Sequence, residues 1–153
     1  MSVRDELRRQ KDEGGREWAA KQAEEHRKQE EEAARVRELE EKRRAAEAEK
    51  ARKKAAEVFA ELPAAVRTAS ARGLDKAVLA DSFVTERSEE GKTCRPMAID
   101  RKTYYLTGWQ IPFYEMCQSD GIPLTVVTER VDVALKGVVH KTYHLLAVDL
   151  KRL

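Results

Sequence analysis

The feature that most constrains the fold of this chain is a run of residues, 16–62, that contains neither glycine nor proline. Alanine, glutamate, lysine, arginine and glutamine dominate it, and these residues favour a helix because they lose little side-chain freedom there. Charge is concentrated in the same part of the chain: 33 of the first 60 residues are Asp, Glu, Lys or Arg, against 25 of the remaining 93. The sequence therefore predicts a long charged helical arm attached to a domain of ordinary composition.

The spacing of the charges supports a helix, because five glutamates stand four residues before a base, the favourable orientation for a helical ion pair. These pairs are Glu24–Lys28, Glu31–Arg35, Glu38–Lys42, Glu40–Arg44 and Glu49–Lys53. Nearer the N-terminus, Gly14 and Gly15 are expected to end a short helix that Ser2 and Asp5 cap. The predicted organisation is a short helix and break over 1–15, the arm over 16–62 and a small domain over 63–153.

A heptad frame tests whether the arm is a coiled coil, with Val36 at position a and Leu39 at position d. Most other a and d positions are polar or small, which is too little apolar surface for a two-stranded parallel seam. We therefore expect a single ion-paired helix, with a parallel coiled coil and a partly disordered charged tract as alternatives. The a positions are Gln22, Gln29, Val36, Arg43, Lys50 and Glu57, and the d positions are Glu25, Glu32, Leu39, Ala46, Lys53 and Ala60.

Charge along the arm falls into two blocks: residues 24–41 carry a net charge of −4 and residues 42–54 a net charge of +5. The simplest interpretation is a solvated helix surface. Two functional alternatives are antiparallel docking between two chains and contact of the basic block with phosphates or an acidic partner, and both would weaken with salt. The basic residues are Lys42, Arg43, Arg44, Lys50, Arg52, Lys53 and Lys54.

An apolar stripe at helical spacing begins near residue 58 and marks the start of the domain. Pro63 interrupts the stripe, so we expect the arm to bend near Leu62 and a separate helix to cover 63–72. Gly73 suits the left-handed position after a helix. The stripe, which we assign to the core, consists of Val58, Phe59, Leu62, Ala65, Val66 and Ala69.

The remaining elements are predicted from alternating and β-branched runs and from turn residues. Segments 76–84 and 93–99 are expected to pair as a hairpin, with Pro96 confining the second to an edge. A helix of about 11 residues should follow, capped by Thr107 and ended by Gly121. Segments 124–133 and 138–150 form a second predicted hairpin around Lys136-Gly137. The fold class is α+β, a long charged N-terminal single helix followed by a small α-β-β-α-β-β layered domain.

Four cysteines and histidines, Cys94, Cys117, His140 and His144, invite comparison with a zinc site. The cysteines are too far apart in sequence for a zinc knuckle, and four residues of strand would separate the histidines by about 13 Å. Cys117 shares an apolar helix face and is expected to be an inert core thiol, whereas Cys94 is more exposed and would carry any thiol chemistry. No nucleotide-binding or hydrolase motif is present, so we expect neither a cofactor nor an enzyme.

One further cluster places basic residues beside aromatic ones: Arg101, Lys102, Tyr104 and Tyr105, just before Trp109. Such a mixture suits single-stranded nucleic acid or an acidic peptide. The alternative is that Tyr105 and Trp109 anchor the second helix on the sheet beside a polar turn. An exposed edge of the second or fourth predicted strand could also accept a strand from a partner.

No apolar run is long enough to span a membrane, and the N-terminus lacks the apolar region of a secretory signal, so a cytoplasmic location is expected. A long helix without a core of its own suggests a non-enzymatic interaction or assembly protein: a spacer or docking arm that carries a binding module. The expected partner is another protein, including self-association through the arm. The alternatives are an RNA- or DNA-associated factor that uses residues 42–54, and a small thiol enzyme.

Overall fold

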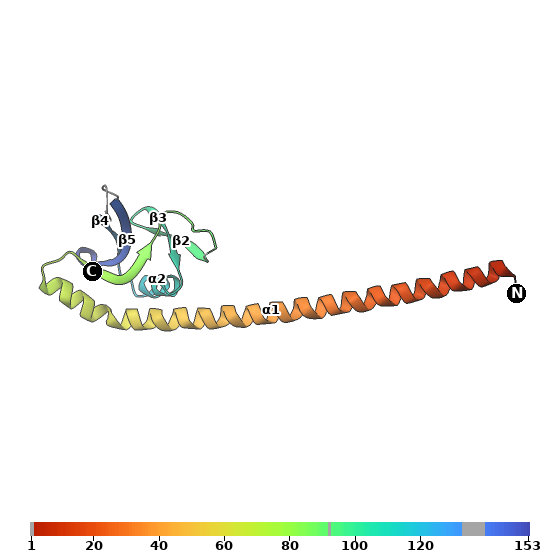
Figure 1. Ribbon diagram of the computed structural model, residues 1–153. Helices are drawn as coiled ribbons and strands as arrows, with labels where there is room; N and C mark the ends of the chain where they lie inside the picture. The colour runs from red at the N-terminus through yellow and green to blue at the C-terminus, as the bar shows by residue number, and fades with distance from the viewer. Residues whose placement is uncertain (1, 92, 133–139) are drawn as a thin grey trace. The chain divides into compact units, whose positions relative to one another are not determined.

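The computed structural model describes residues 2–91, 93–132 and 140–153 (Figure 1). A long N-terminal helix is followed by a strand-rich region and a second helix, which confirms the α+β class. The elements are α1 (Val3–Ala71), β1 (Lys76–Val84), β2 (Cys94–Ile99), β3 (Lys102–Thr107), α2 (Gln110–Ser119), β4 (Leu124–Asp132), β5 (His140–Asp149) and the 3-10 helix η1 (Leu150–Arg152). The chain divides into two compact units, Met1–Ala45 and Ala46–Leu153, which are described separately.

The first unit contains the N-terminal segment of α1, residues 3–45, and this segment is helical throughout. The predicted break at Gly14 and Gly15 was wrong, since both residues lie inside α1. A glycine costs a helix only about 1 kcal/mol relative to alanine, and strong helix formers flank the pair on both sides. The predicted cap is present: the backbone N–H of Asp5 donates to Ser2 Oγ at 3.3 Å.

Ion pairs and exposure characterise the N-terminal segment. Three of the five predicted pairs are formed: Glu24–Lys28 at 3.7 Å, Glu38–Lys42 at 3.5 Å and Glu40–Arg44 at 3.1 Å. Each contributes about 0.2–0.5 kcal/mol to the helix. The large apolar side chains are exposed, at 65% for Leu7, 66% for Trp18, 57% for Val36 and 67% for Leu39.

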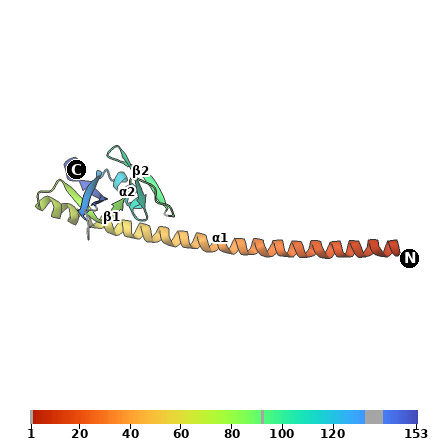
Figure 2. The ribbon, with the colours of Figure 1, turned by 45° about the horizontal axis from the view of Figure 1, so that its top comes forward.

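The C-terminal segment of α1, residues 46–71, belongs to the second unit and packs on it through Ala55, Leu62 and Ala69, which are buried. These three residues are seven apart, so they lie on one face of the helix. Of the predicted stripe, Leu62 and Ala69 are buried and Val58, Phe59 and Val66 pack against the core, which confirms these five positions. A separate helix over 63–72 was wrong, because Pro63 lies within α1. The axis nevertheless turns close to the C-terminal end of α1 (Figures 1 and 2).

The helix ends as the sequence predicts. Gly73 adopts a φ of +70°, and the N–H of Leu74 donates to the carbonyl of Ala69 at 3.0 Å. This six-to-one bond is typical of a Schellman motif, in which a left-handed glycine reverses the chain and satisfies a terminal carbonyl of the helix. The strands can therefore return along the C-terminal segment.

The strands form two antiparallel sheets, one of order β1-β5-β4 and one of β2 and β3. The predicted pairing of 76–84 with 93–99 was wrong, because β1 pairs with β5 and β2 pairs with β3. Sequence analysis missed β3 and treated its start as a polar turn. The actual turn is Asp100-Arg101, two residues with φ of 54° and 65°. Positive φ at both central residues is the geometry of a tight hairpin turn.

Strands β4 and β5 form the predicted second hairpin, with Asp132 opposite His140. Its predicted turn at Lys136-Gly137 lies outside the described residues. Strand β5 is the central strand of its sheet, so the expectation of a free edge at the fourth predicted strand was wrong. The edges of that sheet are β1 and β4, and β2 carries Pro96 along the outer side of its own pair.

One hydrophobic core joins both sheets, α2 and the C-terminal segment of α1. In Figures 1 and 2 α2 and the strands lie on one side of that segment. Phe113 on α2 is fully buried and contacts Phe59 of α1 edge to face, with ring centroids 6.5 Å apart. The other fully buried large side chains are Leu106, Leu146, Val148, Cys117 and Ser82.

An ion-pair network links the two sheets at the C-terminal end. Arg152 donates to Asp149 and to Asp100, both at 2.8 Å, and Asp100 also accepts a hydrogen bond from Thr125. The hydrogen bond from Arg152 lowers the pKa of Asp149, outweighing the partial desolvation of that carboxyl group. The network holds the β2–β3 turn beside the start of β4.

Candidate partner-binding site

The candidate site lies beside a kink in β1. Val78 pairs with Ala147 and Phe83 with Leu145. Between these two pairs β1 therefore contains more residues than β5 does. Asp81, in the middle of the kink, has a φ of 54°, a left-handed conformation that Asp tolerates better than most residues. The kink shifts the inward-facing positions of the strand, so Phe83 lies outside at 50% exposure.

Ser82 fills the gap that the kink leaves in the sheet. Its hydroxyl donates to the carbonyl of Leu79 at 2.7 Å, and it accepts from the N–H of Leu146 at 3.0 Å. Ser82 is completely buried, so these bonds replace the missing strand-to-strand bonds. The kink is therefore a built feature of the strand, with its buried backbone groups satisfied.

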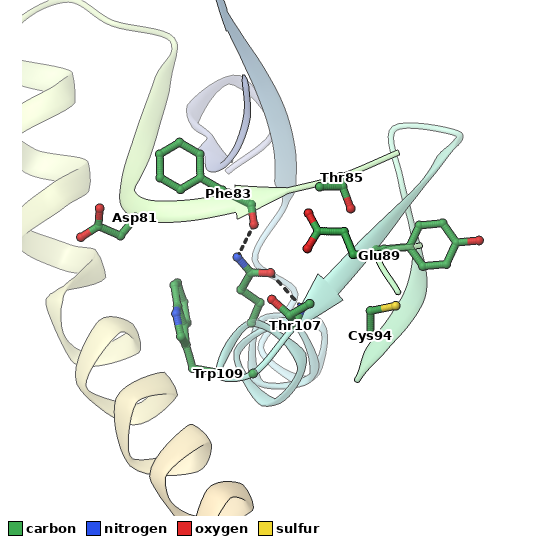
Figure 3. Close-up of a pocket in the computed structure, with 10 residues that line it drawn as sticks. Asp81, Phe83, Thr85, Glu89, Cys94, Thr107 and Trp109 are labelled. Carbon is green, nitrogen blue, oxygen red and sulfur yellow. Dashed lines mark hydrogen bonds between the residues drawn. The ribbon is translucent and has the colours of Figure 1, made fainter. Parts of the chain in front are cut away.

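Gln110, the first residue of α2, fixes the kinked strand to β3. Its side-chain amide donates to the carbonyl of Phe83 at 2.7 Å and accepts from the N–H of Thr107 at 3.0 Å, and both bonds are dashed in Figure 3. Thr107 was predicted to cap α2, but it lies in β3, and the N-cap position is Trp109, whose side chain makes no capping bond. Gln110 is itself buried, so both hydrogen bonds are shielded from water.

A hollow of about 310 Å³ lies over this junction. Its wall combines two carboxylates, Asp81 and Glu89, with aromatic side chains from β1, from β3 and from the residue that precedes α2 (Figure 3). Among the described residues, no basic side chain is in the lining. The residues that line it are Asp81, Phe83, Thr85, Glu89, Cys94, Tyr105, Thr107, Gly108, Trp109 and Gln110.

Trp109 already contacts one cation. The ammonium group of Lys54, on α1, lies 5.5 Å from the centre of the indole ring, and Phe113 packs on the same ring edge to face at 5.6 Å. A cation over an indole face is stabilised by about 0.5–1 kcal/mol at an exposed site. The contact links one residue of the predicted basic segment with one residue of the predicted aromatic cluster.

The structure separates the other members of the aromatic cluster. Arg101 and Lys102 lie at the turn end of β3, whereas Tyr105 is near the other end and lines the hollow. Tyr104 is buried, 6% exposed, and its ring packs against His144 at 5.8 Å. Tyr105 and Trp109 therefore line the same hollow as the carboxylates, whereas Arg101 and Lys102 lie outside it.

The basic segment is exposed over most of its length. Lys42 and Arg44 pair with glutamates of α1, and Arg43 lies 3.8 Å from Glu40. Arg52 lines a second hollow of about 500 Å³ between α1 and α2, beside Phe59, Pro112, Glu115, Met116, Ser119 and Asp120. Lys50 and Lys53 are exposed to solvent.

The two cysteines have different surroundings. Burial, with a smaller contribution from the Asp120 carboxylate, raises the pKa of the Cys117 thiol from 9.0 to about 12, which fits the predicted core thiol. Cys94 is half-buried in the wall of the hollow, with Sγ 3.3 Å from Ser88 Oγ. Both cysteines are free.

Sequence reasoning missed Asp81, Phe83, Glu89 and Gln110. The run Ala-Asp-Ser inside a predicted strand was the one available signal, because Asp is tolerant of a left-handed backbone. Gln110 gave no signal, since its role depends on the carbonyl of Phe83 and the N–H of Thr107, which come together only in the folded second unit. Within residues 2–91, 93–132 and 140–153, no three His, Cys, Asp or Glu residues are grouped so as to hold a metal ion.

Comparison of the chain with protein-family models, with curated proteins and with solved structures finds no match to any of them. None of the described helices combines the length and the apolar character needed to cross a bilayer. Any assignment of function therefore depends on the chemistry of the hollow and on the exposed face of α1.

Proposed function

We propose that this chain is a non-enzymatic interaction or assembly protein, in which the N-terminal segment of α1 is a docking arm and residues 46–153 form a binding head. The observation that carries the proposal is the exposure of Leu7, Trp18, Val36 and Leu39 on a helix that buries none of them. A helix of this length made of polar residues gains most from a partner or from holding two bodies apart. The partner proposed is another protein.

The head offers a site for a positively charged side chain. Asp81 supplies negative charge, and Tyr105 and Trp109 supply ring faces, the combination that stabilises a lysine or arginine side chain of a partner. An anionic ligand would meet repulsion from the Asp81 carboxylate. This revises the ligand expected from sequence, since phosphate or an acidic peptide suits Arg101 and Lys102 but not the hollow.

The experiment for the head is a titration of the full chain with a lysine- and arginine-rich peptide, followed by the fluorescence of Trp109 in a Trp18→Phe background. We expect saturable quenching by the basic peptide and none by its glutamate counterpart. Asp81→Asn, which keeps a side chain tolerant of the backbone conformation, should weaken binding several-fold. Equal binding of both peptides would contradict the proposed site.

The experiment for the arm is affinity capture from source-cell extract with the full chain as bait. A Val36→Glu/Leu39→Glu variant places charges on the exposed apolar residues, and Arg37→Glu is a control on another side of the helix. We expect the variant to lose a captured protein, or further copies of the chain itself, that the control retains. Identical capture by all three baits would contradict a docking arm.

A nucleic-acid function remains the second candidate because Lys50 and Lys53 are exposed beside the paired bases of segment 42–54. Titration with single- and double-stranded oligonucleotides at two salt concentrations tests it, and binding through phosphates should fall steeply as salt rises. Absence of binding at low salt would exclude this function.

The thiol-enzyme alternative has one observation in its favour, the position of Cys94 in the hollow. Ordinary labelling rates at Cys94 with an alkylating reagent would exclude it.

A further inference from the structure

The exposed face of the N-terminal segment has a defined charge pattern. Val36 and Leu39 are 57% and 67% exposed and occupy positions a and d of the heptad frame, which lie on one side of a helix. Before them, the d positions hold acids and the a positions hold glutamines, and after them the next two a positions hold bases. The acids are Glu25 and Glu32, and the bases are Arg43 and Lys50.

This reversal of sign selects the orientation of a partner helix with the same sequence. In a parallel pair each layer joins identical residues, so Glu32 would face Glu32 and Arg43 would face Arg43. In an antiparallel pair, position a faces position d of the other chain. The register in which Val36 faces Leu39 then also places Glu32 opposite Arg43, and Glu25 opposite Lys50.

We infer that the partner of this face is a second copy of the chain, docked antiparallel about a two-fold axis with Val36 of each copy on Leu39 of the other. The inference rests on the proposed function, because it names the partner of the docking arm. Two-fold symmetry forms each contact twice, so the Val36–Leu39 layers lie at the centre and the acid–base layers flank them on both sides.

Charges outside the a and d positions agree with this register. Residues 24–33 carry five glutamates against Arg27 and Lys28, a net charge of −3. They lie opposite residues 42–51 of the other copy, which carry four bases against Glu47 and Glu49, a net charge of +2. A parallel arrangement would instead place each block beside the same block of the other copy, so that like charges would face each other.

The acids and bases of the interface are available for pairing. Glu25, Glu32 and Lys50 make no ion pair within the described part of the chain, and Arg43 makes only a long contact of 3.8 Å with Glu40. Because the apolar centre is small, charge pairs provide much of the attraction. The dimer should therefore form at low salt and dissociate when the screening length falls to about 3 Å at molar salt.

Charge reversal tests the register on the full chain by sedimentation equilibrium at low salt. Glu32→Arg and Arg43→Glu should each dissociate the dimer, because each brings like charges together. An equimolar mixture of the two variants should dimerise, since each new pair across the interface is then an acid with a base. Glu31→Arg is the matched control, with the same change of charge at a position outside the a and d face.

The sedimentation results either support or overturn the antiparallel dimer. A dimer that is lost in both single variants, recovered in the mixture and retained in the control supports the inference. A wild-type chain that is monomeric at low salt and high concentration overturns it, as does equal loss in Glu31→Arg and Glu32→Arg. Circular dichroism checks that every variant keeps the helix, which these exposed substitutions should not disturb.

Disulfide trapping tests the orientation independently, in a Cys94→Ser background that leaves only the buried Cys117. Chains with Val36→Cys are mixed with differently tagged chains with Leu39→Cys under mild oxidation. We expect the mixed 36–39 disulfide to form faster than the 36–36 and 39–39 disulfides. Faster formation of the two identical pairings would indicate a parallel dimer and overturn the inference.

The two proposals fail separately. A monomeric chain whose captured protein partner is lost on substitution of Val36 and Leu39 would retain the docking function and overturn only self-association. Identical capture by all baits, together with a monomeric chain, would overturn both.

Discussion

The two segments of α1 share one backbone conformation but differ in what their side chains contact. In residues 3–45 the leucines at 7 and 39 are exposed, whereas in residues 46–71 Leu62 is 5% exposed and packs in the core. Both segments are rich in helix formers, so propensity is sufficient to explain the secondary structure of either. The difference shows that the spacing of a few apolar residues, and not helix propensity, determines which part of a helix joins a domain.

The largest expected effect comes from comparing one leucine in each segment. Leu62→Ala should reduce the free energy of unfolding of the head by about 2–5 kcal/mol, because it leaves a cavity in the hydrophobic core. Leu39→Ala should change it by less than about 0.5 kcal/mol. Urea denaturation followed by Trp109 fluorescence, in a Trp18→Phe background, measures both, and equal losses would contradict the division of the helix.

A second effect concerns the buried hydroxyl group that completes the kinked strand. Ser82→Ala leaves the N–H of Leu146 and nearby carbonyl groups without their partner, which should cost about 1–3 kcal/mol. Ser70→Ala, on an exposed position of α1, is the control and should be neutral or slightly stabilising. An equally small effect of both substitutions would show that the hydroxyl group of Ser82 does not support the kink.

A third effect is a pH dependence that resides in the head alone. Because the pKa of Cys117 is raised from 9.0 to about 12, the unfolded state releases its proton first as pH increases. Stability is therefore complete below pH 9 and falls between pH 9 and pH 12, by about 1.4 kcal/mol at pH 10. Denaturation of the wild type and of Cys117→Ala at pH 8 and pH 10 isolates this contribution, which is absent if both chains lose the same stability.

The smallest effect belongs to the N-terminal segment. Gly14→Ala and Gly15→Ala should each stabilise the helix locally by about 1 kcal/mol, since a Cβ at either position meets no atom within 4 Å. The early, gradual part of a circular dichroism melting curve should flatten, while the cooperative unfolding of the head should not move. A shift in the unfolding of the head would indicate that the two segments are coupled.

Sequence reasoning predicted most of the elements because their signals are local. The stripe that includes Leu62 and Val66, the strand at 76–84 and the run of β-branched residues at 124–133 each carry their own periodicity. Strand β3 was missed because Arg101-Lys102-Thr103 resembles a turn until Asp100 and Arg101 are seen to form a tighter one. The pairing of β1 with β5 joins residues at least sixty positions apart, so no local pattern could specify it.

The candidate site was predicted only in part, for a related reason. Tyr105 and Trp109 were identified from their chemistry, but their surroundings depend on the kink at Asp81 and on the bridge made by Gln110. Both depend on tertiary structure, and they replace the basic neighbours expected from sequence with carboxylates. For this reason the ligand that we propose for the hollow is a cation, whereas the sequence led us to expect an anion.

Hydrogen exchange along α1 tests the central claim most directly, because it measures the opening of each part of one helix separately. It should be carried out on dilute protein in high salt, where association between arms is suppressed. We predict that amides in residues 46–71 exchange at rates close to those of the sheet core, while amides in residues 3–45 exchange orders of magnitude faster. Equal protection of both segments under these conditions would contradict the account.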